Sequence, residues 1–124
     1  MTNKTGPDLV AEARARITEI APAEALAALA AREESGSKVV FLDVREPNEW
    51  NLGHVPGALH IPRGQLENKV EQMLDRDAHV VVYCAGGSRS ALATDTLRQM
   101  GYDHASSMKA GFRGWVEAGG EIED

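Results

Sequence analysis

The feature of this 124-residue sequence best suited to chemistry is its single cysteine, Cys84, which directly follows the apolar run VVVY. Two glycines, Gly86 and Gly87, come soon after it, and a helix is predicted to begin near Ser88. Glycines let the backbone curl tightly and turn its N–H groups inward, and the first N–H groups of a helix have no partner within that helix. A thiol held among such groups loses its proton below its ordinary pKa of about 8.5 and becomes a nucleophile.

An arginine five residues after the cysteine adds a fixed positive charge to the same segment. Arg89 carries five N–H donors in a planar fork, which suits an oxyanion such as a sulfonate or a phosphate. Taken alone, Cys84 is more simply interpreted as a buried cysteine at the end of a strand. The glycine pair, the helix start and Arg89 together favour a functional site.

Two nearly continuous apolar runs predict the strands that position this segment. Residues 38–43 and 79–83 are apolar at almost every position, which is typical of strands covered on both faces of a parallel sheet. Shorter strands are predicted at 17–20, 58–61 and 105–108. Cys84 therefore lies just beyond the carboxyl end of a buried strand, where open α/β sheets place their ligand crevices.

Helical spacing of apolar residues and helix-boundary signals occur between these strands. Helices are predicted at 23–33, 64–75, 90–100 and 112–118, with a single turn at 46–51 and a short helix within 1–16 that lies outside the main core. Strands that alternate with helices indicate an α/β domain with a mainly parallel sheet.

Composition and charge indicate one ordinary globular domain. The chain is 43% hydrophobic and 26% charged with a net charge of -6, which argues against nonspecific binding of nucleic acid or an anionic membrane. One cysteine excludes an intramolecular disulfide, and four histidines without paired spacing lead us to expect no metal site. The sequence shows no signal peptide and no apolar run of about 20 residues, so a cytoplasmic protein is expected.

Three segments in order resemble the signatures of the rhodanese family. They are LDVREPNEWNLGHVPGALHIP at Leu42–Pro62, CAGGSRS at Cys84–Ser90 and MKAGFRGW at Met108–Trp115. The resemblance covers roughly residues 17–118. It implies a rhodanese-like α/β fold, a central, mainly parallel five-stranded sheet flanked by helices on both faces. We therefore expect an N-terminal extension at 1–16 and a rhodanese-like domain at 17–124.

The resemblance also implies an activity and a site. A sulfurtransferase of this family moves sulfane sulfur from thiosulfate or a similar donor to a thiophilic acceptor, cyanide or a thiol, through a persulfide on Cys84. The implied partners are this small donor and acceptor, with a protein as a further possible sulfur acceptor, and no cofactor is required. Gly111 and Phe112 are implied to form part of the pocket wall. The residues implied to bind substrate are those of the loop, Ala85, Gly86, Gly87, Ser88 and Arg89.

Two alternative functions remain open at this point. Noncatalytic rhodanese-like domains serve as binding or regulatory modules, usually with the cysteine replaced, whereas Cys84 is present here. A thiol-based phosphatase or arsenate reductase is the other alternative. Related phosphatases have Cys-x5-Arg, whereas Cys84 and Arg89 form the shorter Cys-x4-Arg, so the resemblance favours sulfur transfer.

Four other features are predicted to have structural roles. Asp43 is expected to hydrogen-bond loop backbone, and Arg45 is expected to form an ion pair with Glu49, four residues further on. His54, close to a Pro-Gly turn, is expected to be a structural hydrogen-bonding residue. The C-terminal EIED is expected to be a frayed acidic tail.

Overall fold

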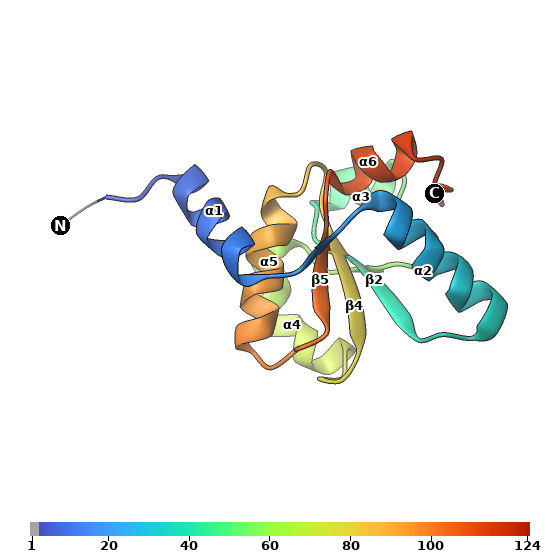
Figure 1. Cartoon of the computed structure of the whole chain (residues 1–124), viewed down its shortest axis with the longest axis horizontal. Coiled ribbons are helices and arrows are strands. Elements are labelled where there is room, and N and C mark those ends of the chain that lie inside the picture. Colours follow the sequence, from blue (N-terminus) through green and yellow to red (C-terminus); the bar gives the residue numbers. More distant parts are fainter. Residues whose placement is uncertain (1–2) are drawn as a thin grey trace.

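The predicted strands form one five-stranded parallel sheet in the order β1-β5-β4-β2-β3 (Figure 1). The computed structural model describes residues 3–124. The strands are β1 (Glu19–Ile20), β2 (Val39–Asp43), β3 (Leu59–His60), β4 (His79–Tyr83) and β5 (Ala105–Met108). The expected α/β class with a parallel sheet is confirmed, and β2 and β4, the two apolar runs, lie side by side near its centre.

Helices connect successive strands, as expected. They are α1 (Gly6–Arg16), α2 (Pro22–Ser35), α3 (Pro47–Asn51), the 3₁₀ turn η1 (Arg63–Gln65), α4 (Leu66–Met73), α5 (Ser88–Gln99) and α6 (Gly111–Glu117). The observed boundaries lie within about two residues of the predicted ones, which is the usual uncertainty at helix ends. No helix within residues 3–124 is long and apolar enough to cross a membrane.

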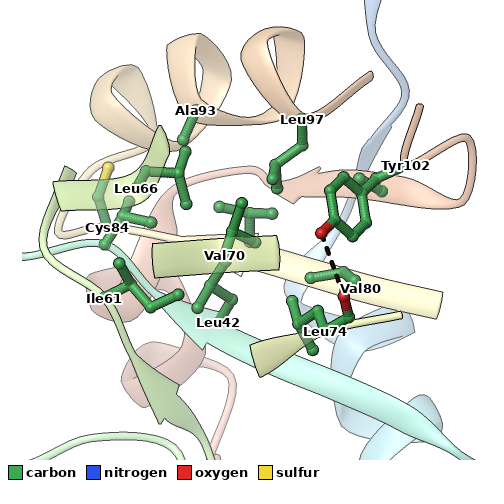
Figure 2. Close-up of a cluster of buried hydrophobic side chains, with 13 residues drawn as sticks. Leu42, Ile61, Leu66, Val70, Leu74, Val80, Cys84, Ala93, Leu97 and Tyr102 are labelled. Carbon is green, nitrogen blue, oxygen red and sulfur yellow. Dashed lines mark hydrogen bonds between the residues drawn. The ribbon is translucent and has the colours of Figure 1, made fainter. Parts of the chain in front are cut away.

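Alternate residues of β4 point to opposite faces of the sheet and supply two separate cores. Val80 and Val82 belong to a cluster with residues of α4 and α5, which Figure 2 shows with Cys84 at one end. Tyr102 closes the other end, where its hydroxyl donates to the carbonyl of Leu74 at 3.1 Å. Val81 belongs to a second cluster on the opposite face, with residues of α2 and α6. The sheet is thus covered on both faces, which explains why its central strands are apolar at nearly every position.

Helix α1 lies against α5 (Figure 1). A capping box between Thr5 and Asp8 fixes its start, and Ala13 is its fully buried residue. At its end, the Arg16 guanidinium donates two hydrogen bonds to the Asp95 carboxylate of α5, at 3.0 and 2.7 Å. The N-terminal segment is therefore attached to the helix that begins at the cysteine loop.

The prediction that the C-terminal residues form a frayed tail is wrong. Glu123 and His54 exchange two backbone hydrogen bonds of 2.9 Å in an antiparallel bridge. The Glu123 carboxylate also accepts from the N–H of Gly57, and the Trp115 indole donates to the carbonyl of Glu121 at 2.8 Å. These long-range partners fix the tail, and its acidic composition gave no indication of them.

Candidate active site

The carboxyl ends of β2 and β4 meet at one edge of the sheet, where Asp43 lies opposite Tyr83. Cys84 follows β4 directly, and the residue is only 1% exposed. The sulfur accepts a hydrogen bond from the N–H of Gly87 at 3.0 Å and a longer one from the N–H of Ser90 at 3.4 Å. The thiol lies 3.6 Å from the Ser90 hydroxyl, to which it can donate. The loop thus surrounds the sulfur with polar N–H and O–H groups.

These contacts make Cys84 more acidic than an ordinary cysteine. Burial raises the pKa of the Cys84 thiol, but hydrogen bonding with the Ser90 hydroxyl and hydrogen bonds from the N–H groups of Ser90, Gly87 and Gly86 together lower the pKa by more than burial raises it. The net pKa lies below the ordinary value. The arrangement favours the thiolate, which is the nucleophilic form.

Ser90 is a site residue that the sequence analysis did not single out. Its hydroxyl donates to the carbonyl of Gly87 at 3.2 Å and lies 2.9 Å from the hydroxyl of Ser107, at the end of β5. Both serines are fully buried. Ser90 is the third residue of α5, so its N–H is one of the groups at the helix start that have no partner within the helix. Its place in the first turn of the predicted helix could have identified it from the sequence.

The five loop residues predicted to bind substrate differ in burial and in their contacts with the Cys84 sulfur. Gly87 contacts the sulfur and, with φ of 111°, is the N-cap of α5. The Gly86 N–H contributes to the lowered pKa of Cys84, whereas the Ala85 carbonyl accepts a hydrogen bond from the N–H of Arg113 of α6. Ser88 is exposed at the start of α5, and Arg89 is partly buried. Substrate binding by these residues stays a prediction.

Arg89 forms a bidentate ion pair with Glu49 of α3, with N–O distances of 2.7 and 3.1 Å. Hydrogen bonding to Arg89 lowers the pKa of Glu49 to about 2. The pKa of Arg89 is raised, mainly by its hydrogen bonds to Glu49 and to a smaller extent by the Cys84 sulfur. Glu49 therefore holds the cation in place beside the cysteine loop.

The predicted ion pair between Arg45 and Glu49 is wrong. Arg45 instead binds Asp43, donating from Nε at 3.0 Å and from Nη2 at 2.7 Å, and it also donates to the carbonyl of Gly53. Helix α3 begins only at Pro47, so Arg45 and Glu49 do not share a helix face and four-residue spacing does not bring them together. Asp43 accepts from the backbone N–H of Arg45, as expected for a residue that binds loop backbone.

The start of α6 forms one side of the cysteine loop. The N–H of Phe112 donates to the carbonyl of Cys84 at 2.7 Å. Gly111 adopts φ of 54°, and a side chain there would overlap the carbonyl oxygen of Cys84 and lie 2.6 Å from that of Ala85. Glycine is therefore required at position 111 by both its conformation and its close contact with the loop.

His54 lies in a stacked arrangement with Trp50 and makes two hydrogen bonds. Its Nδ1 lies 3.1 Å from the carbonyl of Trp50, and its Nε2 lies 3.2 Å from the carboxylate of Glu123. Both contacts agree with the structural role predicted for it. Within residues 3–124, no group of three His, Cys, Asp or Glu side chains is arranged to hold a metal ion.

A parallel α/β sheet with a buried, hydrogen-bonded thiol at its carboxyl edge defines the class of this protein. The chain belongs to the rhodanese-like domain family, which residues 24–118 match. The predicted family membership is confirmed.

Two relatives have names that refer to sulfur chemistry. The putative sulfur carrier protein YrkF of Bacillus subtilis (strain 168) is 31% identical over 95 residues, which cover 77% of this chain and 51% of YrkF. The probable adenylyltransferase/sulfurtransferase MoeZ of Mycobacterium tuberculosis H37Rv is 36% identical over 86 residues, which cover 68% of this chain and 22% of MoeZ. The chain thus spans about half of one relative and about a fifth of the other.

Two solved structures match over most of the chain. A rhodanese-related protein from Thermoplasma volcanium has a TM-score of 0.71 at 31% identity, covering 86% of this chain and 97% of its own. A protein of unknown function from Rhodopseudomonas palustris CGA009, described as a possible tyrosine phosphatase, has a TM-score of 0.85 at 33% identity. That match covers 99% of this chain and 97% of the other, so it includes α1.

Proposed function

We propose that this protein is a sulfurtransferase that carries sulfane sulfur as a persulfide on Cys84. The observation that carries the proposal is the environment of the thiol: a buried sulfur of lowered pKa that accepts hydrogen bonds from N–H groups at the start of α5. The same N–H groups suit an anionic persulfide, because preorganised donors stabilise charge that develops beside them. Family membership and the names of YrkF and MoeZ support sulfur transfer as the class of reaction.

The reaction has two steps in this proposal. The Cys84 thiolate attacks the outer sulfur of thiosulfate; a new S–S bond forms, the old S–S bond breaks and sulfite leaves with its electron pair. An acceptor thiolate or cyanide then attacks the outer sulfur of the persulfide, and Cys84 leaves as a thiolate. Each step exchanges one bond to sulfur for another, so no external oxidant or reductant is needed.

Arg89 is assigned to the binding of the anionic donor. Its pair with Glu49 uses one N–H of Nη1 and one of Nη2, so three of the five guanidinium N–H donors are left for a ligand. Because a guanidinium stays charged throughout the working pH range, Arg89 acts through position and charge and not through proton transfer. Replacement of Arg89 by alanine is expected to raise KM for thiosulfate, and lysine is expected to restore only part of the loss.

Phosphatase activity is a second candidate function, because the R. palustris structure is described as a possible tyrosine phosphatase. The loop from Cys84 to Arg89 has one residue fewer than the Cys-x5-Arg loop of such enzymes, which favours the smaller sulfane sulfur over a phosphoryl group. Steady-state kinetics separates the two candidates. We expect ping-pong kinetics with thiosulfate and cyanide and no hydrolysis of para-nitrophenyl phosphate. Phosphate release that depends on Cys84, without sulfur transfer, would reverse this assignment.

A further inference from the structure

A groove with a volume of about 640 Å³ lies between α1 and the cysteine loop. It is lined by Gly6, Pro7, Val10, Ala11, Arg14 and Ser88. Five of these six residues belong to α1, outside the part of the chain that matches the rhodanese-like domain family. Volume and apolar lining are both typical of a site for a small organic molecule.

Arg14 provides a positive charge where this groove meets the loop. Its Nη2 lies 3.4 Å from the point at which a side chain on Gly87 would begin, and the N–H of Gly87 itself donates to the Cys84 sulfur. Its Nε faces a carboxylate oxygen of Glu19 at 3.5 Å, and within residues 3–124 neither Nη group has a hydrogen-bond acceptor. Arg14 thus has free donors near the loop, and both of its Nη groups are available, whereas each Nη of Arg89 already donates one hydrogen bond to Glu49.

We assign the groove to the second step of sulfur transfer, because it meets the cysteine loop at Ser88, on the outside of the loop, and is not lined by Cys84 itself. When Cys84 carries a persulfide, the loop N–H groups are occupied, so the acceptor has to approach from outside the loop. An acceptor thiolate that nears an anionic persulfide meets like-charge repulsion, and a guanidinium at the loop edge offsets it. The apolar residues Pro7, Val10 and Ala11 lie beyond Arg14 along α1 and can cover an aliphatic chain.

We propose that α1 forms an acceptor subsite for an aliphatic thiol with a carboxylate near its sulfur. The carboxylate pairs with Arg14, and the aliphatic tail lies on Pro7, Val10 and Ala11. The acceptor thiolate forms a bond to the outer sulfur, the bond to Cys84 breaks, and Cys84 takes the electron pair. This inference rests on the proposed sulfurtransferase function.

The test uses the full chain, first loaded with sulfur from thiosulfate and then freed of excess donor. Loss of the persulfide is followed with three acceptors. 2-Mercaptohexanoate has both tail and charge, 2-mercaptopropanoate lacks the tail, and 2-mercaptohexan-1-ol lacks the charge. For the wild type we expect a rate constant about tenfold higher for the hexanoate than for the propanoate, because burial of its three additional methylene groups is favourable but only partial in a groove that is open to solvent.

Variants separate the two halves of the subsite. Arg14→Gln should slow both carboxylates about five- to tenfold and change the alcohol by less than about twofold, the size expected for loss of a partly exposed charged contact. Val10→Ser should abolish the preference for the longer tail. Lys69→Gln, an exposed charge change on α4, is the matched control and should leave all three rate constants unchanged. Equal effects of Arg14→Gln on carboxylates and alcohol, or no tail preference in the wild type, would overturn the proposal.

Direct binding distinguishes failure of this inference from failure of the proposed function. If no persulfide forms in the wild type, sulfur transfer fails, and calorimetric titration of Cys84→Ser with 2-mercaptohexanoate then tests the subsite alone. Weaker binding after Arg14→Gln in that background would retain the subsite without sulfur transfer. Binding that does not depend on Arg14 would eliminate it.

Discussion

At the scale of single residues, the chemistry of the site depends on the few atoms that touch one sulfur. The Ser90 hydroxyl is the side-chain group that lowers the pKa of Cys84, and Ser107 holds Ser90 from the far side without a hydrogen bond to the sulfur. Substitutions of the two serines can therefore be compared to separate direct from indirect effects on the pKa of Cys84.

Ser90→Ala should raise the pKa of Cys84, because the sulfur loses its hydrogen bonding with the Ser90 hydroxyl while its burial persists. The measurement is the rate of alkylation by iodoacetamide as a function of pH, whose midpoint should move to higher pH. Ser107→Ala is the control and should move the midpoint less. An unchanged midpoint in Ser90→Ala would mean that the backbone N–H groups alone set the pKa.

The ion pair between Glu49 and Arg89 should make stability depend on pH in the acid range. The pKa of Glu49 is lowered in the folded state to about 2, so the pair stabilises the fold fully above the ordinary Glu value of 4.5 and its contribution is lost as pH falls towards 2. Both side chains are partly exposed, so we expect at most about 1 kcal/mol at neutral pH.

Denaturant unfolding of the wild type and Glu49→Gln at several pH values measures this contribution. The difference in the free energy of unfolding should be constant at neutral pH and shrink between about pH 4.5 and 2. A difference that grows as pH falls would contradict the assigned pair.

At this scale, the sequence predicted the location of the cysteine loop, which depends on local backbone structure. It did not predict the ion pairs of the arginine side chains. Cys84 and the glycines after it were identifiable because strand, turn and helix start follow one another along the chain. The partner of Arg89 was not identifiable, because Glu49 lies 40 residues away and only the tertiary fold brings the two together. The partner of Arg45 was missed because four-residue spacing indicates a contact only within a helix, and α3 begins after Arg45.

At the scale of elements, the loop is held in place by the start of α6. Gly111→Ala should destabilise the protein by about 3 kcal/mol or more, since an added side chain would overlap the Cys84 carbonyl and the positive φ also disfavours alanine. Gly64→Ala is the matched control, because a side chain there meets no atom within 4 Å, and it should change stability by less than about 0.5 kcal/mol. Thermal unfolding of both variants checks this, and equal melting temperatures would contradict it.

The strands and helices were predictable because each has its own periodic pattern. The apolar run of β4 and the turn residues around it define that strand on local information alone. The acidic tail was mispredicted for the opposite reason, since its order comes from His54 and Gly57, more than sixty residues earlier. Local patterns contain no information on such pairings.

At the scale of the whole molecule, two cores on opposite faces of one parallel sheet leave its carboxyl edge for the site. Cys84 follows the central strand β4, and α5 begins at the cysteine loop. Helix α6 packs against one side of this loop, and α3 provides Glu49, which pairs with Arg89. Arg14 of α1 brings a further cation to the same edge of a chain whose net charge is -6. Arg89 and Arg14 therefore both lie near the edge of the sheet at which we propose that the anionic substrate binds.

The measurement that tests the central claim most directly is the mass of the intact protein before and after incubation with thiosulfate. One sulfur atom should be added at Cys84, and cyanide or dithiothreitol should remove it. Because the chain has no second cysteine, no disulfide can form within it to obscure the adduct. Cys84→Ser should keep the fold, gain no mass and lose turnover. A wild-type protein that never gains the sulfur, or a Cys84→Ser variant that still transfers it, would contradict the assignment.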